Sequence, residues 1–448
     1  MNHQDLAHDT LKKALKAGAD LAEIYILKSS STKIDILNQK IESTDIISDY
    51  GMGIRVIKDR ELGFAYTADF DPASIDQSIS KSLESSKNIP QDQFNVLPYP
   101  IKQELQLDIY DEKINKTAIE DKIKFAMEIE KTAYSFDKRI KKTEKVFYRD
   151  NEIKAVLVNS NGVNISYKLN LCGGLAEVIA EEKKLAEGGT GIDFVKKFDS
   201  LNPERIGKEA AERATELLGA KIIPSQKLHF VFDPVVGTQF LGAISVMLSS
   251  DSVQKEKSLF KDKIGKIVGS KILSIIDNGR LANAVGSSPF DAEGSPTQET
   301  RLIEKGTLTC YLYNCYTAAK DKVKSTGNGH RSSFKSLPEV SPSNLYIEPG
   351  ETSSDDIIKS INKGLFLTRV MGMHTVNPIS GDFSVGAQGI MIENGKKTFP
   401  VRGITIAGNL IEMLKKIEMV GKDLRFLPFG ANLGSPTLLI SDISISGS

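Results

Sequence analysis

The stretch "FDPASIDQSISKSL", residues 70–83, contains a helix start that recurs later in the chain. Asp71 can cap the helix, Pro72 occupies the first helical position, and an isoleucine follows three residues after the proline. The stretch "LNPERIGKEAAERATELLG", residues 201–219, has the same arrangement, with Asn202 as the cap before its proline. This repetition indicates that the first half of the chain contains one structural unit twice.

The chain before each of these helices also follows one order, a helix and then strands. A helix predicted over residues 4–18 precedes four short segments of alternating apolar residues. In the second copy, Thr117 and Glu120 have the spacing of a capping box that opens a helix, and four similar segments follow. We therefore predict two helix–antiparallel meander–helix units, at about 1–90 and 113–220, in an N-terminal domain of residues 1–222. The eight predicted strands cover residues 22–27, 32–37, 53–57, 62–66, 145–149, 152–158, 163–171 and 175–182.

Beyond residue 222 the chain becomes rich in strands and glycine, which predicts a second domain at 223–448. Lys305-Gly306 and Asn394-Gly395 are turn pairs between apolar runs, as in β-hairpins. Short helices are predicted at residues 355–364 and 410–420. Because the strands follow one another instead of alternating with helices, the predicted fold class is α+β, with a mainly antiparallel β C-terminal domain.

Composition and charge exclude several classes of function. The 448 residues include 58 Lys plus Arg and 58 Asp plus Glu, with no basic run, which argues against binding to nucleic acid or an anionic membrane. No apolar run reaches the roughly 18 residues of a membrane span. The start "MNHQDLAHDT" lacks the features of a signal peptide, and three cysteines form no disulfide framework, so we expect a cytoplasmic protein.

The cysteines and histidines form no local metal-binding pattern. Cys310 and Cys315 lie five residues apart in a predicted strand, on opposite faces, and Cys172 has no basic neighbour to activate it. No two histidines are separated by four residues, which is the spacing of a metal-binding pair on a helix. We interpret the thiols as buried and unreactive.

Polar residues in glycine-rich loops are the remaining candidates for chemistry. His330 lies in "STGNGHRSSF", residues 325–334, and His374 lies in another such loop, where functional side chains are often displayed. Asp291 and Glu293 in "SSPFDAEGSPT", residues 287–297, share one face of an extended segment and could divide acid and base roles. A solvated turn with cap-like hydrogen bonds is the more common arrangement for such a pair.

Several motifs of the second half resemble the TldD/PmbA family, once called modulators of DNA gyrase. In order along the chain they are "SSPFDAEGSPT", "STGNG", "ISGDFSVGAQGIMIENG", "PVRGITIAGNL" and "VGKDL". In that family the TldD-type member carries His-Glu-x-x-x-His on a helix after a strand, with a cysteine near the C-terminus. The two histidines bind zinc and the glutamate acts on the metal-bound water.

The helix in the corresponding place here is "QFLGAISVML", residues 239–248. By this resemblance Gly242, Ala243 and Met247 stand where the His, Glu and His would be, and the C-terminal segment has no cysteine. We therefore expect no catalytic residue and no metal in this chain. The pattern is similar to the PmbA (TldE) branch, whose members pair with a TldD-type subunit.

The resemblance implies a non-catalytic subunit of a heterodimeric zinc metallopeptidase that acts on unfolded peptides, with the zinc in the TldD-type partner. The isolated chain could form a homodimer. Two alternatives stay open: a self-sufficient hydrolase with an unrecognised site, and a binding or regulatory protein linked to DNA gyrase. The residues expected to face the substrate chamber or the partner are Asn328, His330, Arg331, His374, Asp382, Asp291 and Glu293.

Overall fold

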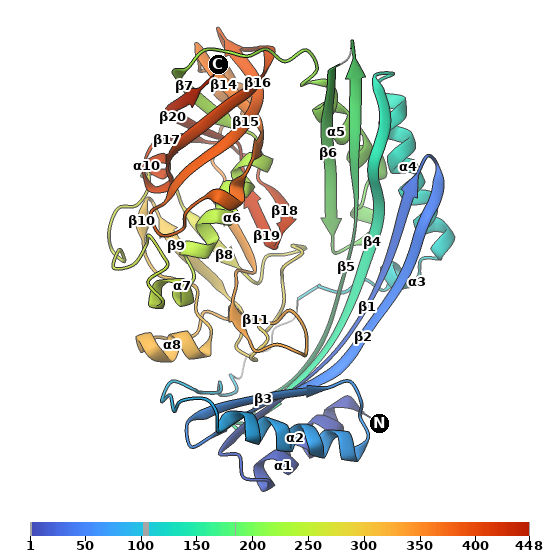
Figure 1. Cartoon of the computed structure of the whole chain (residues 1–448), viewed down its shortest axis with the longest axis vertical. Helices are drawn as coiled ribbons and strands as arrows, with labels where there is room; N and C mark the ends of the chain where they lie inside the picture. The colour runs from blue at the N-terminus through green and yellow to red at the C-terminus, as the bar shows by residue number, and fades with distance from the viewer. Residues whose placement is uncertain (1, 102–106, 184, 448) are drawn as a thin grey trace.

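The N-terminal half is built on one long antiparallel sheet of six strands (Figure 1). We describe residues 2–101, 107–183 and 185–447 of a computed structural model. The strand order is β3-β2-β1-β4-β5-β6, so β1 and β4 join the two units side by side in one sheet. The strands are β1 (Leu21–Leu37), β2 (Lys40–Lys58), β3 (Glu61–Thr67), β4 (Ile140–Asn159), β5 (Asn164–Glu182) and β6 (Leu185–Val195).

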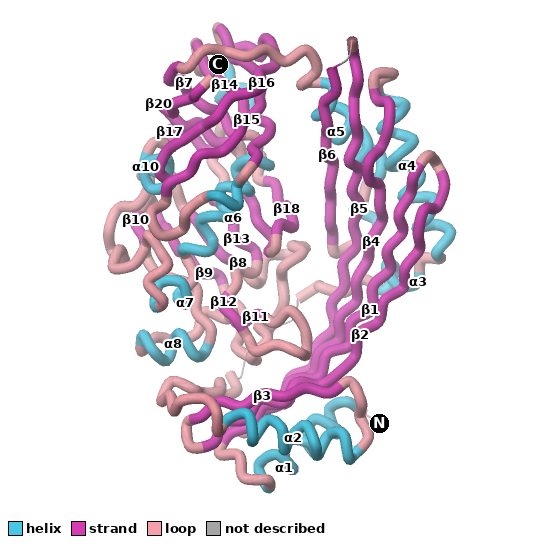
Figure 2. The backbone as a smooth tube through the Cα atoms, in the orientation of Figure 1, coloured by secondary structure: helices cyan, strands magenta, loops and turns pink. Residues whose placement is uncertain are grey.

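Two groups of helices cover this sheet at its opposite ends (Figure 2). α1 (His3–Lys16) and α2 (Pro72–Ser86) belong to the first unit, and α4 (Ile119–Phe136) and α5 (Pro203–Thr215) to the second. Asp71 accepts hydrogen bonds from the backbone of the first turn of α2, and Asn202 does the same for α5. The predicted duplication and the two predicted caps are therefore confirmed. The short helices α3 (Glu112–Lys116) and η1 (Phe198–Ser200) complete this half.

Three local predictions in this half were wrong. Each unit has three strands instead of four short ones, and β1, β4 and β5 each join two predicted segments, because the polar residues between those segments remain in the hydrogen-bonded ladder of a half-exposed sheet. The last strand of the second unit, β6, was missed. Thr117 does not open a helix: it ends α3, and its hydroxyl donates to the carbonyl of Lys113. α4 begins after Ala118 without a side-chain cap.

The C-terminal half contains two further six-stranded sheets and a two-stranded pair. One sheet has the order β10-β9-β8-β13-β19-β18, and the other has the order β16-β15-β14-β7-β20-β17, with an extra pairing of β16 to β20. Most pairings are antiparallel, as predicted, but β7–β14 and β13–β19 are parallel. The strands are β7 (Gln226–Phe232), β8 (Ile275–Asn278), β9 (Glu299–Glu304), β10 (Thr307–Leu308), β11 (Gly329–His330), β12 (Glu339–Val340), β13 (Asn344–Ile347), β14 (Lys363–Met371), β15 (Asp382–Glu393), β16 (Lys396–Asn409), β17 (Ile417–Val420), β18 (Arg425–Phe429), β19 (Ala431–Ser435) and β20 (Leu438–Ser446).

The helices of this half are short apart from α6, which crosses the core. Phe240 of α6 stacks on Phe232 with ring centroids 5.0 Å apart and meets the edge of Phe383 at 5.3 Å. The helix predicted at 410–420 is instead α10 followed by the strand β17, and the one predicted at 355–364 is the shorter α9. No helix within the described ranges is long and apolar enough to cross a membrane. The helices are α6 (Pro234–Met247), α7 (Ser250–Gln254), α8 (Cys315–Asp321), α9 (Ser354–Lys359), η2 (Met373–Thr375) and α10 (Leu410–Lys415).

Candidate functional site

Helix α6 begins directly after the buried strand β7, and its sequence explains both its start and its position. Asp233 accepts a hydrogen bond from the backbone N–H of Val235, and Pro234 occupies the first turn, where no N–H partner is needed. Gly237 lies so close to β19 that an added Cβ would meet the Ser435 Oγ at 2.1 Å. The predicted helix is confirmed, and it is longer at its N-terminal end than the stretch 239–248.

The three positions that correspond to the zinc motif do not face one common space. Gly242 lines a pocket, whereas Met247 is fully buried in the C-terminal core. Ala243 is partly buried and packs against that same core. Of the three, Gly242 alone lines the pocket, and glycine offers no side chain to bind a ligand.

The pocket beside α6 has a volume of about 900 Å³ and lies between the two halves of the molecule. Ser245 and Val246 of α6 form part of its wall, and the start of α8 and the turn between β18 and β19 form other parts. The N-terminal half contributes residues 89–92, 95 and 96, and the loop at 337–342 closes the pocket from another side. Apolar and charged side chains are mixed on its surface: Ile89, Val96, Leu337, Val340, Phe429, Asp92, Asp251, Lys255 and Glu339.

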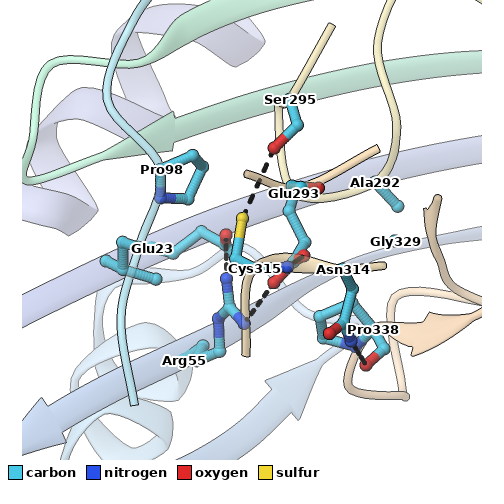
Figure 3. A network of polar contacts seen from close by, with 12 residues as sticks. Glu23, Arg55, Pro98, Ala292, Glu293, Ser295, Asn314, Cys315, Gly329 and Pro338 are labelled. Atoms are coloured by element: carbon cyan, nitrogen blue, oxygen red, sulfur yellow. Dashed lines mark hydrogen bonds and ion pairs between the residues drawn. The ribbon is translucent and has the colours of Figure 1, made fainter. Parts of the chain in front are cut away.

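A buried network of charges forms one end of this pocket (Figure 3). Arg55 of β2 donates from Nη2 to Glu23 Oε2 at 2.6 Å and from Nη1 to Glu293 Oε1 at 3.0 Å. Arg331 donates to the other oxygen of Glu23 and, from Nε, to the carbonyl of Ala292 at 3.1 Å. Two guanidinium groups thus neutralise two carboxylates from opposite halves of the chain, which is the arrangement that makes buried charges tolerable.

The other carboxylate of the "DAEG" segment, that of Asp291, is held by backbone groups. Asp291 accepts hydrogen bonds from the N–H groups of Glu293, Ser295 and Gly329, each at 2.9 Å. Burial and the nearby charge of Glu293 raise the pKa of Asp291. Any side chain at Gly329 would meet Glu293 Cγ at 2.8 Å, so the close approach of the loop requires glycine.

The network also surrounds one thiol. The backbone N–H of Cys315 donates to Glu293 Oε2 at 2.7 Å, and its Sγ lies 3.4 Å from Ser295 Oγ (Figure 3). Burial, followed by the charges of Glu293 and Asp291, raises the pKa of this thiol well above its ordinary value. Burial likewise raises the pKa of the Cys172 thiol to about 12. Both thiols are held in the protonated, unreactive form.

The placement predicted for Cys310 and Cys315 was wrong. The two residues do not share a strand: Cys310 follows β10, and Cys315 is the first residue of α8. The side chain of Asn314 caps that helix, so the segment after β10 leads into a helix start instead of continuing as a strand. Within the described part of the chain, no group of three or more His, Cys, Asp or Glu side chains could hold a metal ion.

Some of the loop residues expected to face a chamber are buried, and others are exposed. Asn328 and Arg331 are buried, which contradicts that expectation for both. Asn328 donates to Asp277 at 2.7 Å, and burial raises the pKa of Asp277 to about 6. His330 is exposed.

His374 and Asp382 are exposed, and Asp382 accepts a hydrogen bond from Asn409. No contact among the described residues joins either of them to His330. That His330, His374 and Asp382 face a substrate chamber or a partner remains a prediction. Asp291 and Glu293, also expected to face the chamber or the partner, are both buried, although Glu293 borders the pocket. The alternative of a solvated turn was wrong about exposure, because both residues are buried, but its cap-like hydrogen bonds are present, from the N–H groups of Glu293 and Ser295 to Asp291.

Sequence reasoning missed Glu23 and Arg55, which hold this site together. Each is a single charged residue within an otherwise apolar strand, "AEIYIL" or "GIRVI". In the β1–β2 register the two residues lie directly opposite each other. A lone charge in a buried strand was the available signal, because such a charge requires a partner.

Comparisons with known proteins agree with this architecture. Three domain models match the chain: PmbA/TldA metallopeptidase domain 1 at residues 22–86, the central domain at 112–218 and the C-terminal domain at 225–447. A protein of Buchnera aphidicola named metalloprotease PmbA homolog is 28% identical over 447 residues, covering 98% of this chain and 96% of its own. An uncharacterised protein of Methanocaldococcus jannaschii is 30% identical, covering 91% and 93%.

A solved structure shows the same fold along the whole chain. It is a Thermotoga maritima protein described as a candidate modulator of a DNA gyrase, with a TM-score of 0.91 and 28% identity. The match covers 99% of this chain and all of the other. The three domain matches, the relatives and this structure together show that the chain belongs to the PmbA/TldD family.

Proposed function

We propose that this chain is the non-catalytic subunit of a TldD/TldE-type heterodimeric zinc metallopeptidase that acts on unfolded peptides. The observation that carries the proposal is α6, where Gly242, Ala243 and Met247 supply neither a zinc ligand nor a general base. Related proteins are named metalloproteases, so the reaction belongs to the family, while the ligands would come from the partner chain. When bound there, zinc would activate water and polarise the scissile carbonyl.

In this proposal the chain helps to hold an extended peptide in the pocket beside α6. The small residues Gly242 and Ser245 leave room along the helix, and the strand β12 borders the same space. The N–H of Ser341 donates to the carbonyl of Asn328, so the backbone of its neighbour Val340 points away from β11. That backbone offers one donor and one acceptor to a peptide in strand conformation.

The buried carboxylates do not support the alternative of a self-sufficient hydrolase. Both oxygens of Asp291 accept backbone hydrogen bonds. Both oxygens of Glu293 are also engaged, one by Arg55 and the other by the N–H of Cys315. A general base needs a free oxygen within reach of its substrate. Location in the cytoplasm and pairing with a TldD-type subunit remain predictions.

The test is metal analysis and a peptidase assay on the lone chain, a TldD-type subunit and their mixture. We expect no stoichiometric zinc and no cleavage of unfolded peptides by the lone chain. The mixture should cleave, with the metal in the other subunit. Chelator-sensitive cleavage by the lone chain would contradict the proposal. Tight binding of one folded protein without cleavage by the mixture would favour the regulatory alternative.

A further inference from the structure

Most of the charge on the pocket beside α6 is compensated within the protein. Of the described residues that border this pocket, the charged ones are Arg55, Asp92, Asp251, Lys255, Glu293 and Glu339. Arg55 and Glu293 belong to the buried network, in which two guanidinium groups meet two carboxylates. Asp251 and Lys255 form a second ion pair, at 2.8 Å. Two carboxylates, those of Asp92 and Glu339, are then left on the pocket wall.

These two carboxylates have no cationic partner. None of the ion pairs among the described residues includes Asp92 or Glu339. Lys320 lies over the ring of Tyr316, with its Nζ 5.3 Å from the ring centre, but it pairs with neither acid. His330 is opposite Glu339 in the β11–β12 pair, and loss of hydration lowers the pKa of its ring, so it is neutral at pH 7. The pocket therefore carries an excess of negative charge.

Asp92 is held in one orientation where the two halves of the chain meet. Its Oδ2 accepts the hydroxyl of Tyr316 in α8 at 2.8 Å, and its Oδ1 accepts the N–H of Phe94 at 2.9 Å. Burial and the hydrogen bond to Asp92 raise the pKa of Tyr316 to about 12, so this partner stays a neutral donor. Asp92 is half-buried, and salt screens such a charge less than an exposed one. It is a fixed negative charge that a positive ligand can approach.

The rest of the pocket wall suits the stem of a long basic side chain. Ile89, Val96, Leu337 and Phe429 border the same space as the two unpaired acids. Lysine and arginine place their methylene groups along apolar surface while their charged ends meet polar groups. An acidic side chain would instead bring a third negative charge to this wall and be repelled.

We propose that the pocket selects peptides that carry a lysine or arginine side chain, with Asp92 as the main opposite charge and Glu339 as a second one. The inference rests on the proposed function for the presence of a peptide, and it adds the class of side chain that the peptide presents. Glu339 directly precedes Val340, whose backbone is available to a peptide strand, so its carboxylate lies close to such a strand. Because Glu339 is exposed, its contribution should be the smaller of the two.

The first experiment measures the binding of three labelled peptides to the lone full-length chain by fluorescence anisotropy. The peptides have six residues, are capped at both ends, and differ only at one central position, which is Lys, Met or Glu. We expect the Lys peptide to bind about five-fold more tightly than the Met peptide, as for a partly exposed ion pair, and the Glu peptide to bind most weakly. The preference for Lys over Met should shrink at high salt.

The second experiment assigns this preference to its residues. Asp92→Asn keeps the size of the side chain and removes its charge, and the Tyr316 hydroxyl can accept from the new amide. This variant should lose most of the preference for Lys while binding the Met peptide as wild type does, which separates lost charge from a damaged pocket. Glu339→Gln should lose less of the preference. Asp199→Asn is the matched control, at an acid outside the pocket with a side chain 75% exposed, and should behave as wild type.

The outcomes separate this inference from the proposed function. Equal binding of the Lys, Met and Glu peptides to wild type would overturn the inference and leave the proposed function standing. Binding of none of the three peptides would contradict the proposed role of the pocket, and the inference with it. A full preference for Lys that persists in Asp92→Asn would show that another group recognises the basic side chain.

Discussion

Lys196 places an ammonium group in the interior of the protein immediately after β6. The residue is 1% exposed, and its Nζ has no hydrogen-bond partner among the described residues. Burial lowers its pKa to about 8. An unpaired buried charge costs free energy, because it loses its hydration by water and gains no equivalent partner in the folded protein. This position is therefore a source of instability that a neutral side chain would remove.

We predict that Lys196→Met stabilises the chain at pH 7 by about 1–3 kcal/mol, the size expected for a shift of this magnitude. The pKa of Lys196 is lower in the folded chain than in the unfolded chain, so between about pH 8 and 10.5 the unfolded chain binds more protons. Wild-type stability should therefore rise with pH across that window, and the rise should be smaller in the variant. Urea unfolding at pH 7 and pH 10 measures both effects.

Lys197→Met is the control for this prediction, since the neighbouring Lys197 pairs with Asp108 and is partly exposed. Its effect should stay below about 1 kcal/mol. If Lys196→Met were less stable than wild type at pH 7, the ammonium group would have to make a favourable interaction in the folded protein.

The charged residues of the site show how far sequence reasoning reached at this scale. Asp291 and Glu293 were singled out because two acids stood together, and the structure brings them into one network with Arg331. Glu23 and Arg55 were missed because their pairing depends on the β1–β2 register. That register could not be predicted while β1 was divided into two short strands.

At the scale of elements, α6 shows why the loss of the zinc motif is not a matter of three side chains alone. Positions 242 and 247 are five residues apart, as the two histidines of the TldD-type motif are, so the packing of the helix decides whether they share one space. In α6 Gly242 borders the pocket while Met247 lies in the core. Residues introduced at these positions could not converge on one ion without a change in the helix itself.

We predict that the combined change Gly242→His, Ala243→Glu and Met247→His creates no stoichiometric zinc site. It should also lower stability by about 2–5 kcal/mol, because a polar ring would replace Met247 in the core. Equilibrium dialysis with metal analysis measures the first effect and thermal unfolding the second. Met247→Leu, which keeps the core apolar, is the control and should cost less than about 1.5 kcal/mol. One tightly bound zinc per variant chain would show that α6 can rearrange into a metal site.

The elements that sequence predicted best are those fixed by local chemistry. The starts of α2 and α5 were correct because a cap, a proline and a periodic apolar face occur together in a few residues. Strand lengths were underestimated because "LKSSS" in β1 is polar yet remains paired to β2 and β4. Polar stretches of that kind are read as loops unless the neighbouring strands are known.

At the scale of the whole molecule, buried and exposed ion pairs join the two halves in different ways. Arg331 reaches from the C-terminal half to Glu23 in β1, and its guanidinium lies 4.8 Å from the centre of the Tyr25 ring. Lys335 also crosses between the halves and meets Asp49 at 3.5 Å, but both of those side chains are exposed. The two pairs allow the effect of burial on the connection between the halves to be measured.

We predict that Arg331→Met lowers the free energy of unfolding by about 3–5 kcal/mol, because Glu23 and Glu293 then share Arg55 alone and one buried negative charge lacks a partner. Lys335→Met should cost less than about 1 kcal/mol. Adding Glu23→Gln to Arg331→Met removes the excess charge, so the double variant should lose less than the sum of the two single variants. In the Arg331→Met variant, calorimetry should resolve two unfolding transitions, one for each half of the chain. A single transition at the wild-type temperature, or additive losses in the double variant, would show that this network does not couple the halves.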